Sequence, residues 1–438
     1  MSTATIEQEL ANARAALQRQ QGDEADRIYR RVLETAPDTS EALNFLGTRA
    51  IRFGRGDEAI ALLERARRAD ANDPNVAFNL GLAHLMAEHV APARDAFRAA
   101  LDLVPEFFLA RLHYARTLEL SGDQDHAVTQ YYAAIQRAQQ QGRWLNDATT
   151  PPLLRDMVKY GMGYAQAHRK RLFEGVLDGV AAKSGRDALK RAYKCLAMFL
   201  GEQPTVYADP RQIPKFLYYP DLPATPYFAR ELFPWYAMLE DNFDVVRAEM
   251  AAVLESGEGI EPFLKFHSPE EVSGYLGGSP KAGWDAFFFY RHGERYDANC
   301  SRCPRTAEIL DALPTLQHIR EHAPEVCFSA LPPGSHILPH RGVVNTRLVT
   351  HFPLKVPQGD LALRVGGEDH VWQEGRCVTF DDTYEHEAWN RTDQLRVVML
   401  LDVWNPYLSA PEREAVTTLV ETIGDFNRAA EGASTQNH

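Results

Sequence analysis

A strict period of 34 residues in the first third of the chain constrains its fold more than any other feature. Alanine recurs at this step at Ala25, Ala59, Ala93 and Ala127. Two further series keep the same step, one of bulky residues and one of small residues: Tyr29, Leu63, Phe97 and Tyr131, and Gly47, Gly81 and Ala115. Small residues at fixed points let two helices approach closely, and bulky residues fill the space between helix pairs. The period therefore predicts a stack of helix pairs.

This register resembles that of tetratricopeptide repeats, whose 34-residue unit is a pair of helices. The resemblance covers about residues 8–140. Such arrays form a superhelix with a concave groove, which implies a binding surface for a peptide or protein substrate or partner. The alternative is a scaffold that only orients the next domain. Nothing in the sequence identifies the partner.

Charge and composition exclude several classes of protein. The net charge of −13 argues against binding to nucleic acid or to anionic membrane surfaces. No apolar run is long enough to span a bilayer, and MSTATIEQELANARAAL at the N-terminus lacks the basic head and apolar run of a secretory signal. Five cysteines, an odd and sparse set, fit reduced thiols. We therefore expect a cytoplasmic protein without a nucleic-acid partner or a transmembrane segment.

The composition changes sharply from residue 201, where GEQPTVYADPRQIPKFLYYPDLPATPY is rich in proline and tyrosine. The stretch before it keeps a helical character. We expect four parts: repeats over 1–145, a helical linker with capping helices over 146–204, a second domain over 205–412, and a C-terminal helix and tail over 413–438.

Short apolar runs alternate with turns in the second domain, after a helix expected around residues 228–255. Six of these runs are candidate strands: 286–292, 325–331, 346–354, 361–366, 376–380 and 395–404. Many short strands with regular turns predict an antiparallel sandwich or jelly roll. The expected fold is thus multidomain, an all-α tetratricopeptide superhelix followed by a double-stranded β-helix, the jelly roll that can enclose a pocket.

Histidines are concentrated in this domain. Three lie in SHILPHRGVVNTRLVTHFP, residues 335–353, and His386 lies in FDDTYEHEAWN. Neutral imidazole is a good ligand for iron, zinc, copper and nickel. The usual non-haem iron triad adds a carboxylate two residues after the first histidine, but Gly342 follows His340 at that spacing. The residues alone leave a metal site and ordinary core or surface histidines both open.

Five motifs then follow one another in order: FPW (233–235), PHRGVVNTRLVTHFPLKVP (339–357), LRVGG (363–367), VWQEGRCVTFDDTYEHEAWN (371–390) and LRVVMLLDVWNP (395–406). Together they make the span from about 205 to 410 resemble the aspartyl/asparaginyl β-hydroxylase family of 2-oxoglutarate oxygenases. In that family two histidines hold the iron without a protein carboxylate. The resemblance therefore accounts for the glycine at position 342.

The resemblance implies roles for individual residues. His340 and His386 would be the metal ligands for Fe(II), and 2-oxoglutarate would meet His351 close to the metal. The far carboxylate of the cosubstrate would meet Ser329 and Arg396. An arginine in an apolar strand needs an anionic partner, and a planar guanidinium binds a carboxylate through two parallel hydrogen bonds.

Four further residues complete the expected site. Asp382 would be the catalytic acid that orders metal-bound water. The family often has a basic residue at the position of Val349, and Arg347, on the same face of an extended strand, is a candidate replacement in binding the cosubstrate. Arg291 and His292 correspond to polar groups that face the substrate.

The function implied is hydroxylation of an aspartyl or asparaginyl β-carbon in a peptide or protein, dependent on Fe(II), 2-oxoglutarate and O2, with the repeats recruiting the substrate or a partner. Three alternatives stay open. The enzyme could hydroxylate a lipid or small molecule, or halogenate its substrate, because a glycine in the carboxylate slot can admit halide. The chain could also be a tetratricopeptide binding scaffold whose oxygenase domain is not catalytic.

Overall fold

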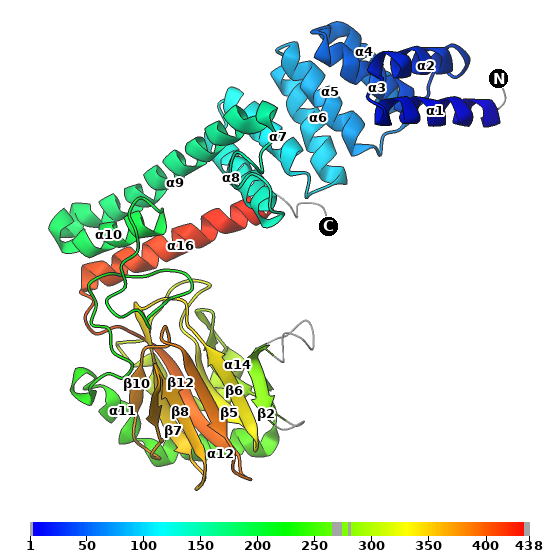
Figure 1. Ribbon diagram of the computed structural model, residues 1–438. Helices are drawn as coiled ribbons and strands as arrows, with labels where there is room; N and C mark the ends of the chain where they lie inside the picture. Colours follow the sequence, from blue (N-terminus) through cyan, green and yellow to red (C-terminus); the bar gives the residue numbers. More distant parts are fainter. Residues whose placement is uncertain (1–2, 265–273, 279–281, 433–438) are drawn as a thin grey trace. The chain divides into compact units, whose positions relative to one another are not determined.

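The computed structural model describes residues 3–264, 274–278 and 282–432. The chain separates into two compact units (Figure 1). The first unit consists of residues 1–171 and 424–438, and the second consists of residues 172–423. The boundaries expected from the sequence at 145, 204 and 412 stay predictions.

The first unit is an array of antiparallel helix pairs, which confirms the predicted tetratricopeptide repeats. Its first eight helices are α1 (Thr3–Gln18), α2 (Gly22–Thr35), α3 (Ser40–Arg52), α4 (Gly56–Ala69), α5 (Pro74–Met86), α6 (Val90–Leu103), α7 (Phe108–Leu120) and α8 (Gln124–Gln140). The short helix η1 (Pro152–Leu154) and the first part of α9 (Arg155–Ser184) follow. Consecutive helices pack against each other along the array.

Steric contacts inside the pairs explain the 34-residue period. A Cβ atom on Gly47 would lie 2.5 Å from Cγ of Leu63, and a Cβ atom on Gly81 would lie 2.6 Å from the ring of Phe97. Both contacts are too close for any side chain larger than hydrogen. The four alanines of the period are fully buried in the same helix pairs. Glycine and alanine therefore recur because the backbone of one helix lies directly against a bulky side chain of the next.

We expect Gly81→Ala to destabilise the first unit by about 1–2 kcal/mol. Overpacking against Phe97 costs about 1–3 kcal/mol, and the better helix propensity of alanine returns up to about 1 kcal/mol. Gly163→Ala in α9 is the matched control, because nothing lies within 4 Å of the added methyl group. Urea unfolding should show a loss for Gly81→Ala and a small gain for Gly163→Ala. Equal midpoints for the two variants would contradict this account of the period.

The second unit also contains helices. They are the rest of α9, η2 (Arg186–Leu189), α10 (Lys190–Phe199), η3 (Arg230–Leu232), α11 (Tyr236–Glu240), α12 (Phe243–Ser256), α14 (Asp297–Arg302), α15 (Pro304–Asp311) and α16 (Ala410–Gly432) as far as residue 423. The helix predicted around 228–255 is thus found as α11 and α12. Of these helices, α12 and α14 contact strands of the larger of the two sheets. The proline-rich segment from residue 201 is extended, and its main chain bonds to 342–343 and 379–383.

The described residues of the second unit form twelve strands in two antiparallel sheets. They are β1 (Ile260–Pro262), β2 (Leu276–Gly278), β3 (Asp285–Arg291), β4 (Glu294–Arg295), β5 (Val326–Leu331), β6 (Ser335–His340), β7 (Arg347–Lys355), β8 (Leu361–Val365), β9 (Glu368–His370), β10 (Val378–Phe380), β11 (His386–Asn390) and β12 (Arg396–Trp404). The larger sheet has the order β1-β3-β5-β12-β7-β10, with β4 paired to β3, and the smaller has the order β2-β6-β11-β8-β9. The chain passes back and forth between the sheets from β5 to β8 and again from β9 to β12, which confirms the jelly roll.

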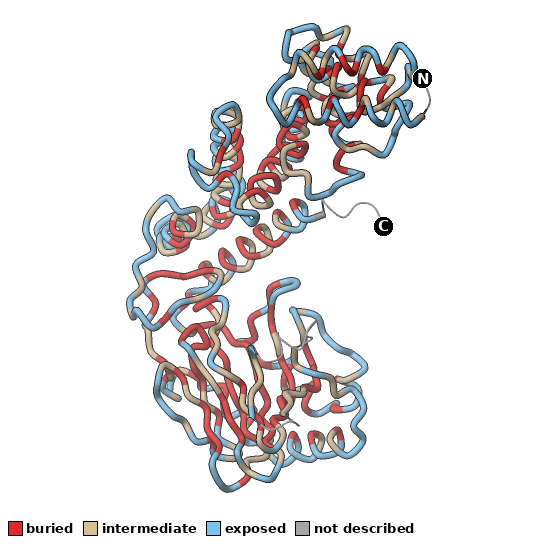
Figure 2. The backbone as a smooth tube through the Cα atoms, turned by 45° about the vertical axis from the view of Figure 1, so that its right-hand side comes forward, coloured by how far each residue is buried: buried red, intermediate tan, exposed pale blue. Residues whose placement is uncertain are grey.

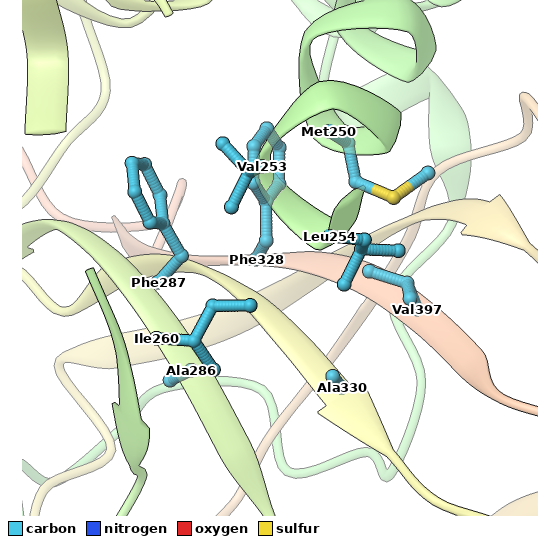
Figure 3. A pocket seen from close by; sticks show the side chains of 9 residues that line it. All are labelled: Met250, Val253, Leu254, Ile260, Ala286, Phe287, Phe328, Ala330 and Val397. Carbon is cyan, nitrogen blue, oxygen red and sulfur yellow. The ribbon is translucent and has the colours of Figure 1, made fainter. Parts of the chain in front are cut away.

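Two apolar layers hold this domain together, and its strands are largely buried (Figure 2). One layer lies between the sheets and includes Val349, Phe380 and Val398. The other covers the opposite face of the larger sheet, where α12 packs with Phe287 and Phe328. A small apolar cavity remains in this second layer, between α12 and strands β3, β5 and β12 (Figure 3). The layer between the sheets is the one that surrounds the candidate site.

All six predicted strands are present, as β3, β5, β7, β8, β10 and β12. Strands β6 and β11, which carry His340 and His386, were not among the predictions. Their outward faces are polar, with His336 on β6 and Glu387 on β11, so neither strand reads as an apolar run. An antiparallel sheet with one solvated face needs no such run.

Candidate active site

His340 and His386 lie side by side on neighbouring strands of the smaller sheet. Their Cα atoms are paired in the β6–β11 register, and their ring centroids are 4.0 Å apart. Desolvation by burial lowers the pKa of both imidazoles, and that of His386 falls to about 4. Both rings are therefore neutral at physiological pH, the form in which imidazole binds a metal.

A β-bulge in β6 brings the two rings to the same face. Between Ile337, which pairs with Ala388, and His340, which pairs with His386, β6 contains one residue more than β11. Regular alternation from Ile337 would turn His340 outward, and the extra residue turns it inward with Ile337 and Ala388. Pro339, which has no N–H to donate, lies within the bulge.

Hydrogen bonds to the main chain fix the tautomer of each ring. Nδ1 of His340 lies 2.8 Å from the carbonyl oxygen of Leu338, and Nδ1 of His386 lies 3.1 Å from that of Tyr384. A carbonyl oxygen only accepts, so each Nδ1 donates and each Nε2 keeps its lone pair. Two neutral, oriented imidazoles with free Nε2 atoms fit the nitrogen ligands of one divalent metal ion.

Asp382 occupies the space beside Gly342. A Cβ atom on Gly342 would lie 2.2 Å from the carboxyl carbon and from Oδ2 of Asp382. Oδ2 of Asp382 accepts a hydrogen bond from Arg347, while its buried Oδ1 has no hydrogen-bond partner. Among the described residues, no group of three or more His, Cys, Asp and Glu side chains is placed to hold a metal. The donor set is thus two histidines with a nearby carboxylate that has one oxygen free to accept from water.

His351 presents the opposite tautomer. Its Nδ1 accepts a hydrogen bond from the indole Nε1 of Trp372 at 3.2 Å, so its Nε2 carries the proton and can donate. Burial, and then the charge of Arg396, lower the pKa of His351 well below its usual value. His351 is therefore a neutral hydrogen-bond donor, whereas His340 and His386 are acceptors.

Arg396 is a buried cation that has no counterion among the described residues. Its side chain is 1% exposed, and Nη1 donates to the main-chain oxygen of Ser329 at 3.2 Å. The guanidinium carbon lies 4.7 Å from the ring centroid of Trp372, and Nε has no hydrogen-bond partner. No carboxylate among the described residues forms an ion pair with it, and burial lowers its pKa to about 9. Such a site favours an anionic ligand, because an unpaired buried charge is costly.

Ser329 completes this end of the site. It lies opposite Val398 in the β5–β12 register, on the face that packs between the sheets. Its Oγ accepts a hydrogen bond from the indole Nε1 of Trp284 at 3.0 Å, which leaves the hydroxyl hydrogen free to donate. Donors from Ser329, His351 and Arg396 are therefore available on the inner face of one sheet, as a dicarboxylate ligand requires.

Three predicted residues have other partners in the structure. Arg347 bonds to Asp382 at 2.5 Å and to Asp402 at 3.2 Å, so its guanidinium is already engaged. Arg291 pairs with Glu261 at 2.9 Å and donates to the main-chain oxygen of residue 263. His292 is an exposed residue of the β3–β4 turn, with a φ of 50° and its Nδ1 2.9 Å from Glu325. Their proposed roles toward cosubstrate and substrate stay predictions.

Trp372 and Trp284 contact residues of the predicted site, although no role was predicted for either tryptophan from the sequence. Both donate an indole N–H to a residue of the predicted site, and Trp372 also stacks on Arg396. Their position could have been suspected, because a buried indole N–H usually has a partner. The partner itself depends on how the strands pair.

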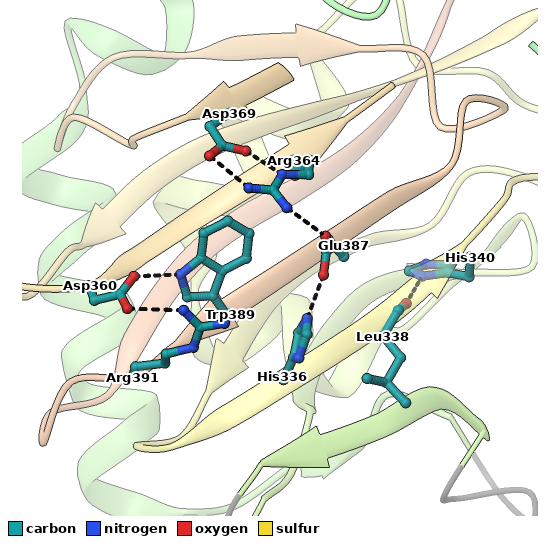
Figure 4. A network of polar contacts seen from close by, with 9 residues as sticks. All are labelled: His336, Leu338, His340, Asp360, Arg364, Asp369, Glu387, Trp389 and Arg391. Atoms are coloured by element: carbon teal, nitrogen blue, oxygen red, sulfur yellow. Dashed lines mark hydrogen bonds and ion pairs between the residues drawn. The ribbon is translucent and has the colours of Figure 1, made fainter. Parts of the chain in front are cut away.

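The outward face of the smaller sheet carries a network of hydrogen bonds and ion pairs between side chains (Figure 4). Glu387 accepts from His336 at 2.7 Å and from Arg364 at 3.3 Å, and Arg364 also pairs with Asp369. These contacts link β6, β11, β8 and β9 across the sheet. His336 therefore lies in a strand, on the face opposite to the imidazole pair.

Comparison with known proteins identifies both parts of the chain. Residues 240–406 match the aspartyl/asparaginyl beta-hydroxylase family, and residues 10–74 and 78–143 match the tetratricopeptide repeat. Among the residues that the structure describes, every helix is too short or too polar to cross a membrane.

Three curated relatives illustrate the likeness. The mouse (Mus musculus) aspartate beta-hydroxylase domain-containing protein 2 is 33% identical over 239 residues, which cover 53% of this chain and 65% of that protein. The human (Homo sapiens) aspartyl/asparaginyl beta-hydroxylase is 24% identical over 368 residues, 82% of this chain and 42% of that protein. The Rhizobium tropici ornithine lipid ester-linked acyl 2-hydroxylase is 34% identical over 45% of this chain and 66% of that protein. The chain thus spans two thirds or less of each relative.

We expect Trp372→Phe to let His351 populate both neutral tautomers without unfolding the domain. Phenylalanine keeps an aromatic face for Arg396 but removes the N–H that His351 accepts, a loss of about 1 kcal/mol. Nitrogen-15 NMR of the imidazoles should show a single Nε2–H tautomer for His351 in the parent and a mixture in the variant. Trp389→Phe on the outward face is the control, and a mixture in both variants would contradict the assignment.

Gly342→Ala should destabilise the second unit by about 1–3 kcal/mol. The new methyl group would collide with the carboxyl group of Asp382, which is held by Arg347 and cannot retreat freely. Gly283→Ala is the matched control, since its methyl group would meet Pro332 at an ordinary 3.6 Å. Thermal unfolding measures the difference, and the prediction fails if Gly342→Ala melts with the control.

Proposed function

Because the chain carries a domain of the aspartyl/asparaginyl β-hydroxylase family after an array of tetratricopeptide repeats, we propose that it is an Fe(II)- and 2-oxoglutarate-dependent hydroxylase. The observation that carries the proposal is the unpaired guanidinium of Arg396 on the inner face of the larger sheet. A buried cation with no acid beside it is best explained by a ligand that brings a carboxylate.

The residues divide the task between two ends of the site. His340 and His386 would hold the metal through Nε2, and two protein ligands leave most coordination positions open. Fe(II) bound there supplies the activation of O2, with 2-oxoglutarate as the electron donor. Nε2–H of His351 would donate to the cosubstrate close to the metal. The hydroxyl of Ser329 and the guanidinium of Arg396 would bind its far carboxylate.

Asp382 has a separate role in this proposal. Its Oδ1, which has no hydrogen-bond partner among the described residues, would accept a hydrogen bond from water on the metal. The side chain is 7% exposed, so bulk solvent does not compete strongly for that oxygen. The aromatic rings of Trp284 and Phe380, whose centroids lie 6.3 and 5.8 Å from the imidazoles, would help to exclude water around the reacting atoms.

For the substrate we propose an aspartyl or asparaginyl side chain of a peptide or protein, hydroxylated at its β-carbon. The human relative with the wider coverage is named for that reaction, and tetratricopeptide arrays offer a groove for a peptide. Hydroxylation of a lipid acyl chain is the second candidate. It is favoured by the 34% identity to the ornithine lipid acyl 2-hydroxylase and by the apolar Val349 between Arg347 and His351 on the inner face of β7.

We expect His340→Ala to abolish the binding of Fe(II) and Arg396→Met to weaken the binding of 2-oxoglutarate. Truncating one partner of a buried charge pair costs about 2–5 kcal/mol, so the Kd for 2-oxoglutarate should rise about 30-fold or more. Anaerobic calorimetry measures both affinities, and succinate formation after O2 is admitted measures turnover. His336→Ala and Arg364→Met, on the outward face, are the matched controls.

The proposal is wrong if His340→Ala and Arg396→Met both bind metal and turn over 2-oxoglutarate like the parent. With the parent active, mass spectrometry decides between the substrates. A lysate proteome and a lipid extract are incubated separately with the loaded enzyme, and the gain of one oxygen atom is sought in each. Oxygen gained only in acyl chains would replace the peptide substrate by the lipid one.

A further inference from the structure

We propose that Arg347, braced by Asp402, is a positioning residue that holds the Asp382 carboxylate in the space left by Gly342, beside the imidazole pair. This inference rests on the proposed function, because it assigns Arg347 to the metal end of the site. It replaces the expectation that Arg347 binds the cosubstrate.

Strand pairing places Arg347 between two carboxylates. Arg347 is the first residue of β7 and pairs with Trp404 of the neighbouring strand β12. Asp402, two residues before Trp404, lies opposite Val349. Nη2 of Arg347 lies 2.5 Å from Oδ2 of Asp382, and Nη1 lies 3.2 Å from Oδ2 of Asp402. The side chains of the three residues are 13%, 7% and 2% exposed, in the order Arg347, Asp382 and Asp402.

Asp402 is itself held in place. The main-chain N–H of Glu325 donates to its Oδ2 at 2.9 Å, and the backbone of Asp402 is paired within the larger sheet. The guanidinium of Arg347 is therefore fixed from the side away from Asp382. One planar cation bridges a carboxylate on a strand of the sheet and a carboxylate on the loop before β11, a geometry that suits arginine better than lysine.

Asp382 is restrained at two points. Its main-chain oxygen accepts from the N–H of Gly342 at 2.6 Å, and its Oδ2 accepts from Arg347. The carboxyl group then lies within 2.3 Å of the place that a Cβ atom on Gly342 would take. Gly342, two residues after His340, thus leaves room for the carboxyl group of Asp382, which lies in the loop between β10 and β11.

A purely structural role accounts poorly for this cluster. Buried ion networks seldom stabilise a fold more than apolar side chains of the same size, because desolvation opposes the attraction. This one also leaves Oδ1 of Asp382 and Nε of Arg347 buried without partners. A carboxylate held from one side, with its other oxygen unpaired next to two neutral imidazoles, points to a ligand at that oxygen. Water on a bound metal ion is such a ligand.

The test compares metal affinity in variants that keep the charge balance as far as possible. Arg347→Lys keeps one positive charge but cannot bridge both carboxylates, and Asp382→Asn keeps the shape of the acid without its charge. CoCl2 is titrated into each full-length protein under argon and followed by visible absorption. Arg391→Lys is the control, because this exposed arginine pairs with Asp360 on the outward face. Melting temperatures establish that each variant is folded.

We expect Arg347→Lys and Asp382→Asn each to lower the affinity for Co(II) about ten-fold. Loss of a partner that orders metal ligands typically lowers metal affinity 10–100-fold. The double variant should be no weaker than the weaker single variant, because both changes remove the same contact. Asp402→Asn, which leaves the Arg347–Asp382 pair intact, should fall between Arg347→Lys and the parent. The KM for 2-oxoglutarate should stay within two-fold of the parent in Arg347→Lys.

Two results would overturn the inference while leaving the enzyme assignment intact. In the first, Arg347→Lys binds Co(II) within two-fold of the parent. In the second, Arg347→Lys raises the KM for 2-oxoglutarate ten-fold at unchanged Co(II) affinity, which would make Arg347 a cosubstrate contact. A parent that binds Co(II) no more tightly than His340→Ala would instead remove the proposed function, and the inference with it.

Discussion

The antiparallel pairing of β6 with β11 is the constraint on which the candidate site depends. It sets two imidazoles from distant parts of the chain directly opposite each other, and a single extra residue in β6 turns His340 to the inner face, where regular alternation in β11 already places His386 with Ala388. Carbonyl oxygens two residues before each histidine then fix the tautomer. Without the bulge, regular alternation would leave His340 on the outward face with His336, and the two imidazoles would not lie together.

Two arginines on the inner face of the larger sheet show opposite electrostatic arrangements. Arg347 has two carboxylates within hydrogen-bonding distance, whereas Arg396 has a main-chain carbonyl and an indole ring but no acid from the part of the chain that the structure describes. Burial acts on both, so the difference lies in the partners that neighbouring elements supply. A cation already neutralised by the protein serves the internal arrangement of the site. A buried cation without a counterion is costly, which is why we propose an anionic ligand for Arg396.

Elements of this protein could be predicted from the sequence where local pattern and local geometry coincide. The repeats could be predicted because each glycine of the period faces a bulky side chain 16 residues later, within one helix pair. Six strands could be predicted because their inner faces are continuously apolar. The roles of His340, His386, His351 and Arg396 followed only from a family resemblance, and these roles stay predictions. Strands β6 and β11 escaped prediction because polar side chains, His336 and Glu387, lie on their outward faces.

By itself the sequence determined the helical repeats, the β-rich character of the second domain and the residue types that can bind a metal and a dicarboxylate. Only the tertiary structure decided which tautomer each histidine adopts, that Trp372 serves both His351 and Arg396, and that Arg347 meets Asp382 and Asp402. The reason is physical. Helix pairing and strand character depend on residues close in the chain, while tautomers and buried ion pairs depend on atoms brought together by strand register over tens of residues.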